Sequence, residues 1–555
     1  LNGRFAYDHN YSSDVRRQKN FEVKQYLGKD LVTNEDMYSA ILREATPLGY
    51  TSGNGANRAY YSEFILNYSR SFGSHDVSGM MMYNQRDYTD LTAGTSINNL
   101  PFRRQGVASR LTYAFLNRYL LEFNAGYNGS ENFPREKRFG FFPSVSAGWV
   151  LSNEKFWGTD NAINHLKLRG SYGKVGNDEI GGRRFLYLTY MNAQDAQSYR
   201  FGDNMQSMAG IDEAQTGNPD VSWEVSQKSN LGLDLEMFNS KVVMQVDAFW
   251  EDRNEILLQR QQIPFVTGIY PWVIPYANLG KVNNKGIDGM LEVKNRTASG
   301  FYYSGRVNMT HAKNIIIEND EPNQRYPWLS AKGQPIDQPF GWVAEGIFKD
   351  QEEINNSPEQ RLGRPVQPGD IKYRDLNDDN IIDDNDRKAI GLPRTPRVVY
   401  GFGGTVAYKG FDLSLFFTGA AQTSIYLYGA TMYPFQDGVG TFNVQTEYYD
   451  NRWTTENPNG KYPAAITVAN PNNNRASTLW QVDGSYLRLK NAEFAYTFEQ
   501  GKLSRIGMNS LRLFANAVNL HTWDKVKIMD PESDSGTNFY PLQRTLNFGL
   551  QVNFK

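Results

Sequence analysis

The sequence predicts an all-β protein, a transmembrane antiparallel β-barrel. Three observations support this: stretches of alternating apolar and polar residues recur along the chain, their lengths are similar, and their charges fall on one face only. Because successive side chains of a strand point to opposite faces, each such stretch has one apolar and one polar face. A membrane barrel needs this arrangement, since lipid contacts its outside and water its inside.

The last of these stretches, Thr545 to Phe554, has the clearest pattern. One face carries Leu546, Phe548, Leu550, Val552 and Phe554, and the other carries Asn547, Gly549, Gln551 and Asn553. Ten extended residues rise about 33 Å and, tilted by about 45°, cross about 25 Å, the height of a barrel's apolar band. A soluble β-sandwich or β-propeller alternates in the same way and stays as the alternative reading of the pattern.

The same alternation predicts the other strands in chain order. They are Ser74–Tyr83, a hairpin over 107–127 that turns at Leu116–Arg118, Phe141–Leu151, Leu166–Lys174, Trp223–Leu235 with Lys241–Glu251, Gly286–Lys294 with Phe301–His311, Val398–Tyr408 with Phe411–Ala421, Ser485–Phe498 and Ser510–Leu520. Before residue 90, two polar stretches are expected to interrupt the strands, Tyr11–Asn20 and Thr51–Asn57. The count is roughly 16 to 18 strands, below the roughly 22 of plugged outer-membrane transporters.

Four long segments without strand alternation separate these hairpins, at about 193–213, 252–278, 315–396 and 428–479. The other connections are short turns. Outer-membrane barrels have short turns at the periplasmic end and long loops outside the cell. The four segments are therefore expected to be extracellular loops of one barrel unit that spans residues 1–555.

Composition excludes several classes of protein. The net charge is −2 and the pI about 6.3, so no nucleic-acid-binding surface is expected. Mean hydropathy is −0.60 and no apolar run approaches 18 residues, which excludes membrane-spanning helices. Aromatic residues make up 14% of the chain, which suits aromatic girdles at two membrane interfaces or surfaces that stack on carbohydrate.

The chain has no cysteine, which excludes disulfides, thiolate metal sites and cysteine nucleophiles. It begins in a strand-like segment at Leu1 with no signal peptide. Since a barrel protein must be exported, we expect the sequence to be a portion that lacks its N-terminal part.

Several motifs resemble the C-terminal barrel portion of SusC/RagA-type TonB-dependent outer-membrane transporters of Bacteroidota. They run in family order from about Arg110 to the C-terminus. They include Phe141–Trp149, Leu168–Asn177, Asn218–Glu224, Asn278–Gly286, Arg452–Pro458, Gly484–Asn491, Asn519–Trp523, Asp530–Glu532 and the final strand.

This resemblance implies a 22-stranded barrel around an N-terminal plug, and it places the protein in the outer membrane, in contact with lipid. It also implies a SusD-like surface lipoprotein as a lid, the TonB complex as the partner of the plug, and a dimer of transporter–lid pairs. The plug, the TonB-contacting segment and the first strands have no counterpart in this sequence, so no residue here is assigned to TonB.

An acidic segment, Asp375 to Asp386, has the spacing of a calcium loop. Its positions 1, 3, 5, 7, 9 and 12 are Asp375, Asn377, Asp379, the carbonyl of Ile381, Asp383 and Asp386. Two features depart from that pattern: Asn380 stands where glycine is usual, and Asp386 is shorter than the usual glutamate. Ile382 is expected to anchor the loop inward. The segment predicts a structural Ca²⁺ site, and a solvated acidic turn is the alternative.

Six aromatic residues in the long loops are candidates for stacking on sugar rings or packing a peptide: Tyr270, Trp272, Tyr276, Trp328, Tyr433 and Phe435. The alternative is that they pack the loops, line the membrane interface or contact a lid protein. No histidine–glutamate metal motif or nucleophile elbow occurs, so no catalysis is expected. The resemblance implies an importer of oligosaccharides, with oligopeptides as the second cargo. An outer-membrane hydrolase and a structural surface barrel are the remaining alternatives.

Overall fold

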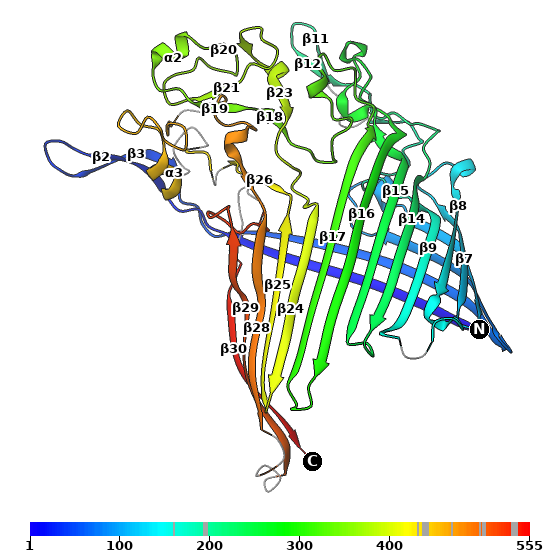
Figure 1. The fold of residues 1–555 in the computed structure, drawn as a ribbon. Coiled ribbons are helices and arrows are strands. Elements are labelled where there is room, and N and C mark those ends of the chain that lie inside the picture. Colours follow the sequence, from blue (N-terminus) through cyan, green and yellow to red (C-terminus); the bar gives the residue numbers. More distant parts are fainter. Residues whose placement is uncertain are drawn as a thin grey trace.

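One antiparallel sheet of sixteen strands forms most of the molecule in the computed structural model (Figure 1). The structure describes residues 1–158, 161–192, 198–429, 432–435, 443–467, 470–498, 501, 507–533 and 542–554. The strands lie in sequence order: β1 (Asn2–Gln18), β4 (Gly49–Phe72), β5 (His75–Asp90), β6 (Phe102–Phe115), β7 (Tyr119–Ser130), β8 (Phe139–Val150), β9 (Ile163–Asn177), β14 (Glu224–Met237), β15 (Val242–Gln259), β16 (Tyr276–Arg296), β17 (Tyr302–Glu318), β24 (Val398–Tyr408), β25 (Phe411–Ala421), β28 (Tyr486–Phe498), β29 (Met508–Asp524) and β30 (Thr545–Phe554).

The strand count agrees with the 16 to 18 expected from the sequence. The first strand, β1, pairs only with β4, and the last, β30, pairs only with β29. Among the described residues no ladder joins β1 to β30, so this wall curves without closing into a ring (Figure 1). The 22-stranded barrel and the plug remain predictions from the family resemblance.

Short turns and long loops lie at opposite ends of the sheet, as the sequence predicts (Figure 1). The tightest turns are two or three residues long, such as 73–74, Leu116–Arg118 and Lys409–Gly410. Lys409 and Gly410 have φ of 48° and 87°, the left-handed pair that a two-residue hairpin turn requires. The loops at the other end include 178–223, 260–275, 319–397 and 422–485.

Two polar stretches expected to interrupt strands are themselves strand. β1 continues through Tyr11 to Gln18, and β4 begins at Gly49 and contains Thr51–Asn57. The two segments pair with each other, with Asn10 opposite Asn57 and Asp14 opposite Gly53. Their ladder lies at the loop end of the sheet, where polar side chains can meet water on both faces. Loop-forming residue types therefore do not prevent a strand when a partner strand satisfies the backbone.

All four long segments contain more regular structure than the sequence indicated, and the 428–479 segment holds the short helix α3 (Thr446–Asn451). β15 and β16 extend into 252–278, which leaves 260–275 as the loop. The 193–213 segment holds β11 (Ser198–Phe201), β12 (Gln206–Ala209) and the start of β13 (Asp212–Gln215), which pairs with β10 (Tyr190–Asn192); residues 193–197 lie outside the described residues. The 315–396 segment contains β18 (Phe340–Trp342), β19 (Ala344–Ile347), α2 (Gln351–Asn355), β20 (Glu359–Gln360), β21 (Ile371–Tyr373), β22 (Ile381–Ile382) and β23 (Arg387–Ala389).

The remaining elements are short. They are the hairpin β2 (Val23–Lys29) and β3 (Asp36–Arg43), α1 (Ser96–Asn99), β26 (Ser424–Tyr426), α3 (Thr446–Asn451) and β27 (Gln481–Asp483). Figure 1 shows β2 and β3 projecting away from the sheet at the loop end. No helix in the described ranges has the length and apolar character needed to cross a membrane.

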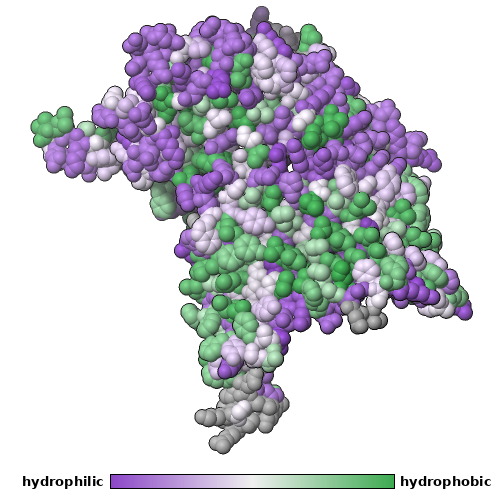
Figure 2. Space-filling model, viewed as in Figure 1, coloured by the Kyte–Doolittle hydropathy of each residue, from purple (hydrophilic) through white to green (hydrophobic). Residues whose placement is uncertain are grey.

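The outward face of the sheet is a band of exposed apolar side chains (Figure 2). It includes Phe64, Leu66, Leu111, Leu121, Phe123, Leu168, Leu231, Ile287, Leu291, Val307, Leu413, Leu513, Leu546, Phe548 and Leu550. The polar loop region lies above this band in the same view (Figure 2). Soluble monomers rarely expose so large a continuous apolar surface to water, whereas membrane barrels bury such a band in the hydrocarbon of the bilayer.

Candidate functional site

The inner face of the sheet, opposite the apolar band, carries rows of ion pairs. The most extensive row crosses three strands. Arg169 on β9 reaches across β14 to Asp247 on β15. Gly232 on β14 lies between them, because it is the register partner of both residues. Both terminal nitrogens of the Arg169 guanidinium donate to the two Asp247 carboxylate oxygens at 2.5 Å, and Nε donates to Asp234 Oδ1 at 3.2 Å. This two-pronged geometry is the strongest form of the pair.

Gly232 is required for that row. A Cβ added to residue 232 would lie 2.5 Å from the Arg169 Cζ atom and 2.7 Å from an Asp247 carboxylate oxygen. The guanidinium therefore reaches across β14 only because the middle residue has no side chain. This row was not predicted from the sequence, because it depends on the register between three strands.

Replacement of Arg169 by Gln is expected to lower the stability of the barrel wall by about 2 kcal/mol. The variant removes the charged donor of Asp247, while Asp234 keeps Lys167 at 3.9 Å. Hydrogen bonds to charged groups contribute roughly 1.5–3 kcal/mol each. Gly232→Ala is expected to act in the same direction. Denaturant unfolding of the detergent-solubilised protein measures the loss.

Arg306 on β17 provides the matched control for this prediction. It also lines the inner face, is exposed, and has no ion-pair partner in the part of the chain that the structure describes. We expect Arg306→Gln to change the stability by less than about 0.5 kcal/mol. Equal losses for Arg169→Gln and Arg306→Gln would contradict the importance of the three-strand row.

Further ion pairs line the same face at other strands. Arg110 on β6 pairs with Glu122 on β7, and Arg512 on β29 bonds both Asp412 and Glu493 at 2.6 and 2.8 Å. Arg488 is fully buried, and its Nη2 donates to both Asp530 carboxylate oxygens at 2.8 Å, while Nη1 donates to Glu532 at 3.1 Å. These contacts tie the loop after β29 to the wall.

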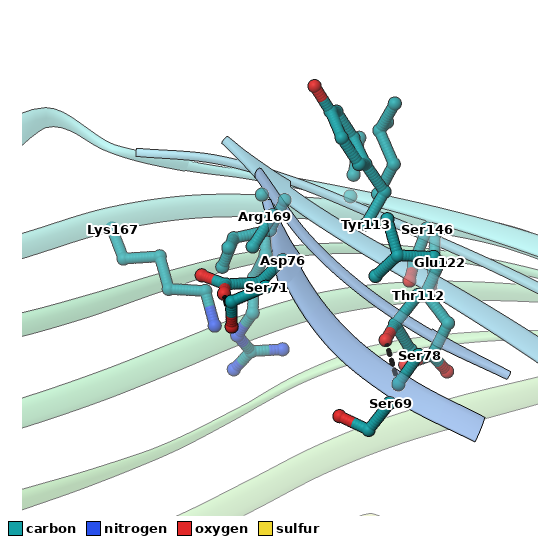
Figure 3. Close-up of a pocket in the computed structure, with 18 of the residues that line it drawn as sticks. Ser69, Ser71, Asp76, Ser78, Thr112, Tyr113, Glu122, Ser146, Lys167 and Arg169 are labelled. Atoms are coloured by element: carbon teal, nitrogen blue, oxygen red, sulfur yellow. Dashed lines mark hydrogen bonds between the residues drawn. The ribbon is translucent and has the colours of Figure 1, made fainter. Parts of the chain in front are cut away.

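A hollow of about 740 Å³ lies on the inner face, bounded by β4 to β9 and by Asn230 of β14. Figure 3 shows side chains that line it. Hydroxyl and charged groups dominate its lining: Ser69, Ser71, Asp76, Ser78, Thr112, Glu122, Ser146, Lys167, Arg169 and Ser171. A second hollow of about 610 Å³ lies against β15 to β28, with Asp247, Asp288, Arg306, Lys490 and Glu532 in its lining. Charged and hydrogen-bonding groups on the inner face suit water and polar solutes.

A cap at the loop end is built from three segments that are far apart in sequence. The 319–397 and 422–485 loops and the 525–533 segment share one core, formed by Trp342, Leu362, Ile371, Tyr373, Ile382, Ile425, Leu427, Met432, Tyr433, Tyr448, Tyr462, Trp480 and Val526. At its centre the Trp480 ring stacks with Tyr448 and Tyr462. The cap is therefore a folded unit that stands on the sheet.

A buried polar network joins the two large loops of the cap. The Asp370 carboxylate, fully buried, accepts from the side-chain amides of Asn470 at 2.7 Å and Asn473 at 2.9 Å. Gln360 bonds the carbonyl of Ile371 and the side chain of Asn472. Buried polar groups are stable only when their partners are present, so this network holds the loops in one arrangement.

The acidic segment lies on the cap in a tightly turned conformation. Asp375 accepts three backbone N–H groups, from Asn377, Asp378 and Asn380. Asn380 has φ of 62°, the conformation glycine takes at that position of a calcium loop. The predicted anchor Ile382 is fully buried, and the pairing of β20 with β22 fixes that end of the loop.

The side-chain oxygens of the Asp375–Asp386 segment are less favourable to metal binding than its backbone conformation. Asp386 is fully buried, and its two carboxylate oxygens accept from the backbone N–H groups of Leu376 and Asp383. Burial raises the pKa of the Asp386 carboxyl, and the negative charges of Asp375 and Asp383 act in the same direction. Within the described ranges, no three carboxylate or imidazole side chains are grouped closely enough to hold a metal ion.

Glu321 at the base of the cap is expected to make its stability pH-dependent. Although burial acts to raise its pKa, hydrogen bonds from Ser330, the backbone of Ala331 and Asn319 hold the pKa of Glu321 below its usual range. A lowered pKa stabilises the fold above the ordinary carboxyl range, and this contribution is lost as the pH falls through the folded-state value. Glu321→Gln is therefore expected to destabilise the cap at pH 7 and to match wild type at low pH.

The exposed residue Glu352 of α2 gives the control, because Glu352→Gln is expected to change the cap stability by less than about 0.5 kcal/mol. Thermal unfolding followed by tryptophan fluorescence between pH 3 and 7 measures both variants. A Glu321→Gln difference that persists at the lowest pH would contradict the prediction.

The six aromatic candidates have different environments. Tyr433 is buried in the cap core, where burial raises its pKa to about 12 and its hydroxyl contacts Tyr426. Tyr276 is the first residue of β16 and packs against a small core of Phe133, Ile180, Leu186 and Val221. Tyr433 therefore packs in the cap core. The loop position predicted for Tyr276 is wrong, because this residue begins a strand.

The other four candidates lie at the surface or close to it. Trp328 is half-buried and stacks on Tyr326, and Phe435 is half-buried beside Tyr449 and Arg452. Tyr270 and Trp272 are exposed and stack on each other. The structure thus leaves this last pair as the most accessible aromatic surface of the six candidates.

Comparison with known proteins gives a consistent result. Residues 1–520 match the family model described as TonB dependent receptor-like, beta-barrel. The chain is 29% identical over 518 residues to TonB-dependent receptor P26 of Formosa agariphila, which covers 88% of this chain and 49% of that protein. It is 26% identical over 458 residues to TonB-dependent receptor SusC of Bacteroides thetaiotaomicron, which covers 80% of this chain and 43% of that protein.

Solved structures agree on the fold. The RagAB peptide transporter superposes with a TM-score of 0.71 at 20% identity, covering 99% of this chain and 60% of that one. The same importer in its "open-open" state gives a TM-score of 0.72 at 19% identity, covering 100% of this chain and 59% of that one. The chain spans about half the length of the curated relatives it matches.

Proposed function

The chain belongs to the TonB-dependent receptor β-barrel family and is an outer-membrane protein of the Bacteroidota type, and we propose that it forms the wall of an energised nutrient importer. The observation that carries the proposal is the contrast between the two faces of the sheet. Apolar side chains cover the outside, and the ion-paired row of Arg169, Asp234 and Asp247 lines the inside. A wall of this kind gives polar solutes a watery path through lipid.

The proposed cargo is an oligosaccharide, because of the resemblance to SusC/RagA-type transporters and because hydroxyl and charged groups line the inner hollows. Oligopeptides are the second candidate. They are favoured by the likeness in fold to a structure described as a peptide transporter. No hydrolytic step is part of the proposal.

The proposed partners follow from the family. A SusD-like lipoprotein would cover the extracellular mouth, and TonB would act on the part of the protein that precedes this barrel portion. Two such transporter–lid pairs would form a dimer. The cap, a folded unit at the loop end of the sheet, offers a large rigid surface for a lid.

We also propose that the acidic loop of Asp375 to Asp386 takes up one Ca²⁺ ion with a structural role. Support comes from the sequence spacing of its ligand positions and from the backbone of Asn380, and Asp375 and Asp383 place negative charge around Asp386. Isothermal titration of the purified protein with Ca²⁺ tests the site. Binding that is lost in Asp379→Ala is the expected result, and no heat of binding in wild type would remove the proposal.

Uptake in living cells tests the importer. A strain that lacks the full-length gene is supplied with labelled oligosaccharides and, separately, with labelled oligopeptides of similar mass. Loss of oligosaccharide uptake alone is the expected result. Loss of peptide uptake alone would favour the second cargo, and unchanged uptake of both, or hydrolysis of either by the purified protein, would contradict an importer without catalysis.

A further inference from the structure

The sequence Tyr-Pro-Trp occurs twice in the loops at the extracellular end, at residues 270–272 and 326–328. Each copy folds into one turn of 3-10 helix that begins at the proline, and the N–H of the residue after the tryptophan bonds the tyrosine carbonyl, at 3.0 and 3.1 Å. In both copies the rings stack nearly parallel, with centroids 4.6 Å apart and interplanar angles of 10° and 7°. The tripeptide is therefore a small, rigid aromatic unit.

The second copy shows what this unit binds. The indole Nε1 of Trp328 donates to the main-chain carbonyl of Asn385 at 2.8 Å. The side-chain amide of Asn377 donates to the Tyr326 hydroxyl at 3.3 Å. A polar, asparagine-containing turn of polypeptide thus occupies the two polar edges of the Tyr326–Trp328 pair.

The first copy has the same geometry, and its two rings are exposed to solvent. Tyr270 is 45% exposed and Trp272 is 56% exposed. Among the described residues, neither the Tyr270 hydroxyl nor the Trp272 indole N–H has a hydrogen-bond partner. Large aromatic side chains with a free polar edge are the residues that most often dominate protein–protein binding.

The pair is anchored before any partner binds. The next residue, Val273, is buried, and Gln259 at the end of β15 donates to the carbonyls of Pro271 and Ile274. At the base of the same loop, Arg260 pairs with the buried Asp320. Since the rings are already stacked and anchored, binding would order few side chains, which favours affinity.

We propose that the Tyr270–Trp272 pair is a docking point for a partner protein, which places a polar turn with a main-chain carbonyl and a carboxamide on the two rings. The inference rests on the proposed function in one respect: the partner is the lid lipoprotein at the extracellular mouth. A protein partner fits better than cargo because neither residue lines any of the described hollows, and small-molecule sites are concave.

The test uses the full-length protein and the lid lipoprotein that purifies with it, separated and recombined in detergent. The affinity of the lid is measured for wild type, Trp272→Ala, and the double variant Tyr270→Phe with Trp272→Phe, which keeps two rings and removes both polar edges. We expect the lid to bind at least ten-fold more weakly to Trp272→Ala, and the double variant to lose several-fold. Trp328→Phe is the matched control, with lid affinity expected to stay within two-fold of wild type.

The outcomes separate this inference from the proposed function. Lid affinity unchanged in both Trp272 variants would overturn the docking point and leave the importer intact. A loss of oligosaccharide or peptide binding by Trp272→Ala with unchanged lid affinity would likewise overturn it and assign the pair to cargo. Absence of any lid protein on the wild type would overturn the docking point together with the lid partner of the proposed function.

Discussion

Replacement of Leu231 by Arg is expected to prevent most of the protein from folding into a membrane. Leu231 lies at the middle of β14, and its side chain is 61% exposed on the apolar face. A lipid-facing arginine near the middle of a membrane barrel costs about 2–4 kcal/mol. The folded yield in lipid vesicles, read from the altered gel mobility of unheated barrels, measures the loss.

Its neighbour Asn230 provides the control on the opposite face. Asn230 belongs to the lining of the inner hollow, so Asn230→Arg places the same charge in water. We expect this variant to fold with a yield close to wild type. Equal defects in the two variants would mean that the faces of β14 do not meet lipid on one side and water on the other.

Replacement of Trp480 by Ala is expected to unfold the cap while the sixteen-stranded wall persists. Trp480 is fully buried, stacks with Tyr448 and Tyr462, and its indole N–H bonds the Asn473 carbonyl at 2.7 Å. Truncation of a buried tryptophan to alanine costs about 3–5 kcal/mol. Because the contact network of this residue lies in the cap, the loss falls on the cap.

Limited proteolysis and hydrogen exchange measure that loss locally. In Trp480→Ala, protection is expected to fall in 319–397 and 443–467 and to remain in β14 to β17. The control is Tyr449→Ala, since Tyr449 is exposed on α3 and contacts chiefly Arg452, a contact that contributes less than about 1 kcal/mol. Uniform protection across the variant, or a loss that includes the wall, would contradict an independently packed cap.

The strands that the sequence predicted best are those confined to the apolar band. The bounds expected for Val398–Tyr408, Phe411–Ala421 and Thr545–Phe554 agree with β24, β25 and β30. In these strands, alternation begins and ends with the strand, and the Lys409–Gly410 pair marks the turn. Because lipid contacts one face of these strands and water the other, their residues alternate between apolar and polar.

The same signal fails where that contrast is absent. At the loop end β1 and β4 meet water on both faces, so alternation stops although the ladder from Asn10 to Asp14 continues. The cap core and the Asp370 network join residues about 100 positions apart without any periodicity. The Arg169–Gly232–Asp247 row depends on strand register, which one sequence without its partners does not specify.

The kinds of residue in the candidate site could be predicted from the sequence, but the residues that are accessible could not. An acidic turn and aromatic loops were evident from residue type, and the turn with its buried Ile382 is present as expected. Burial decided which aromatics remain accessible: Tyr433 belongs to the cap core, whereas Trp272 faces solvent. Loop sequences carry no periodic signal of burial, so this distinction required the three-dimensional structure.

The absence of cysteine permits the most direct test of the two-faced wall, because single cysteines can be placed along β14 at 228, 229, 230, 231 and 233 and spin-labelled in lipid vesicles. We expect alternation: labels at 229, 231 and 233 are relaxed by oxygen dissolved in lipid, and labels at 228 and 230 by a water-soluble nickel complex. Equal access of the nickel complex to 230 and 231 would contradict a wall with lipid on one face and water on the other.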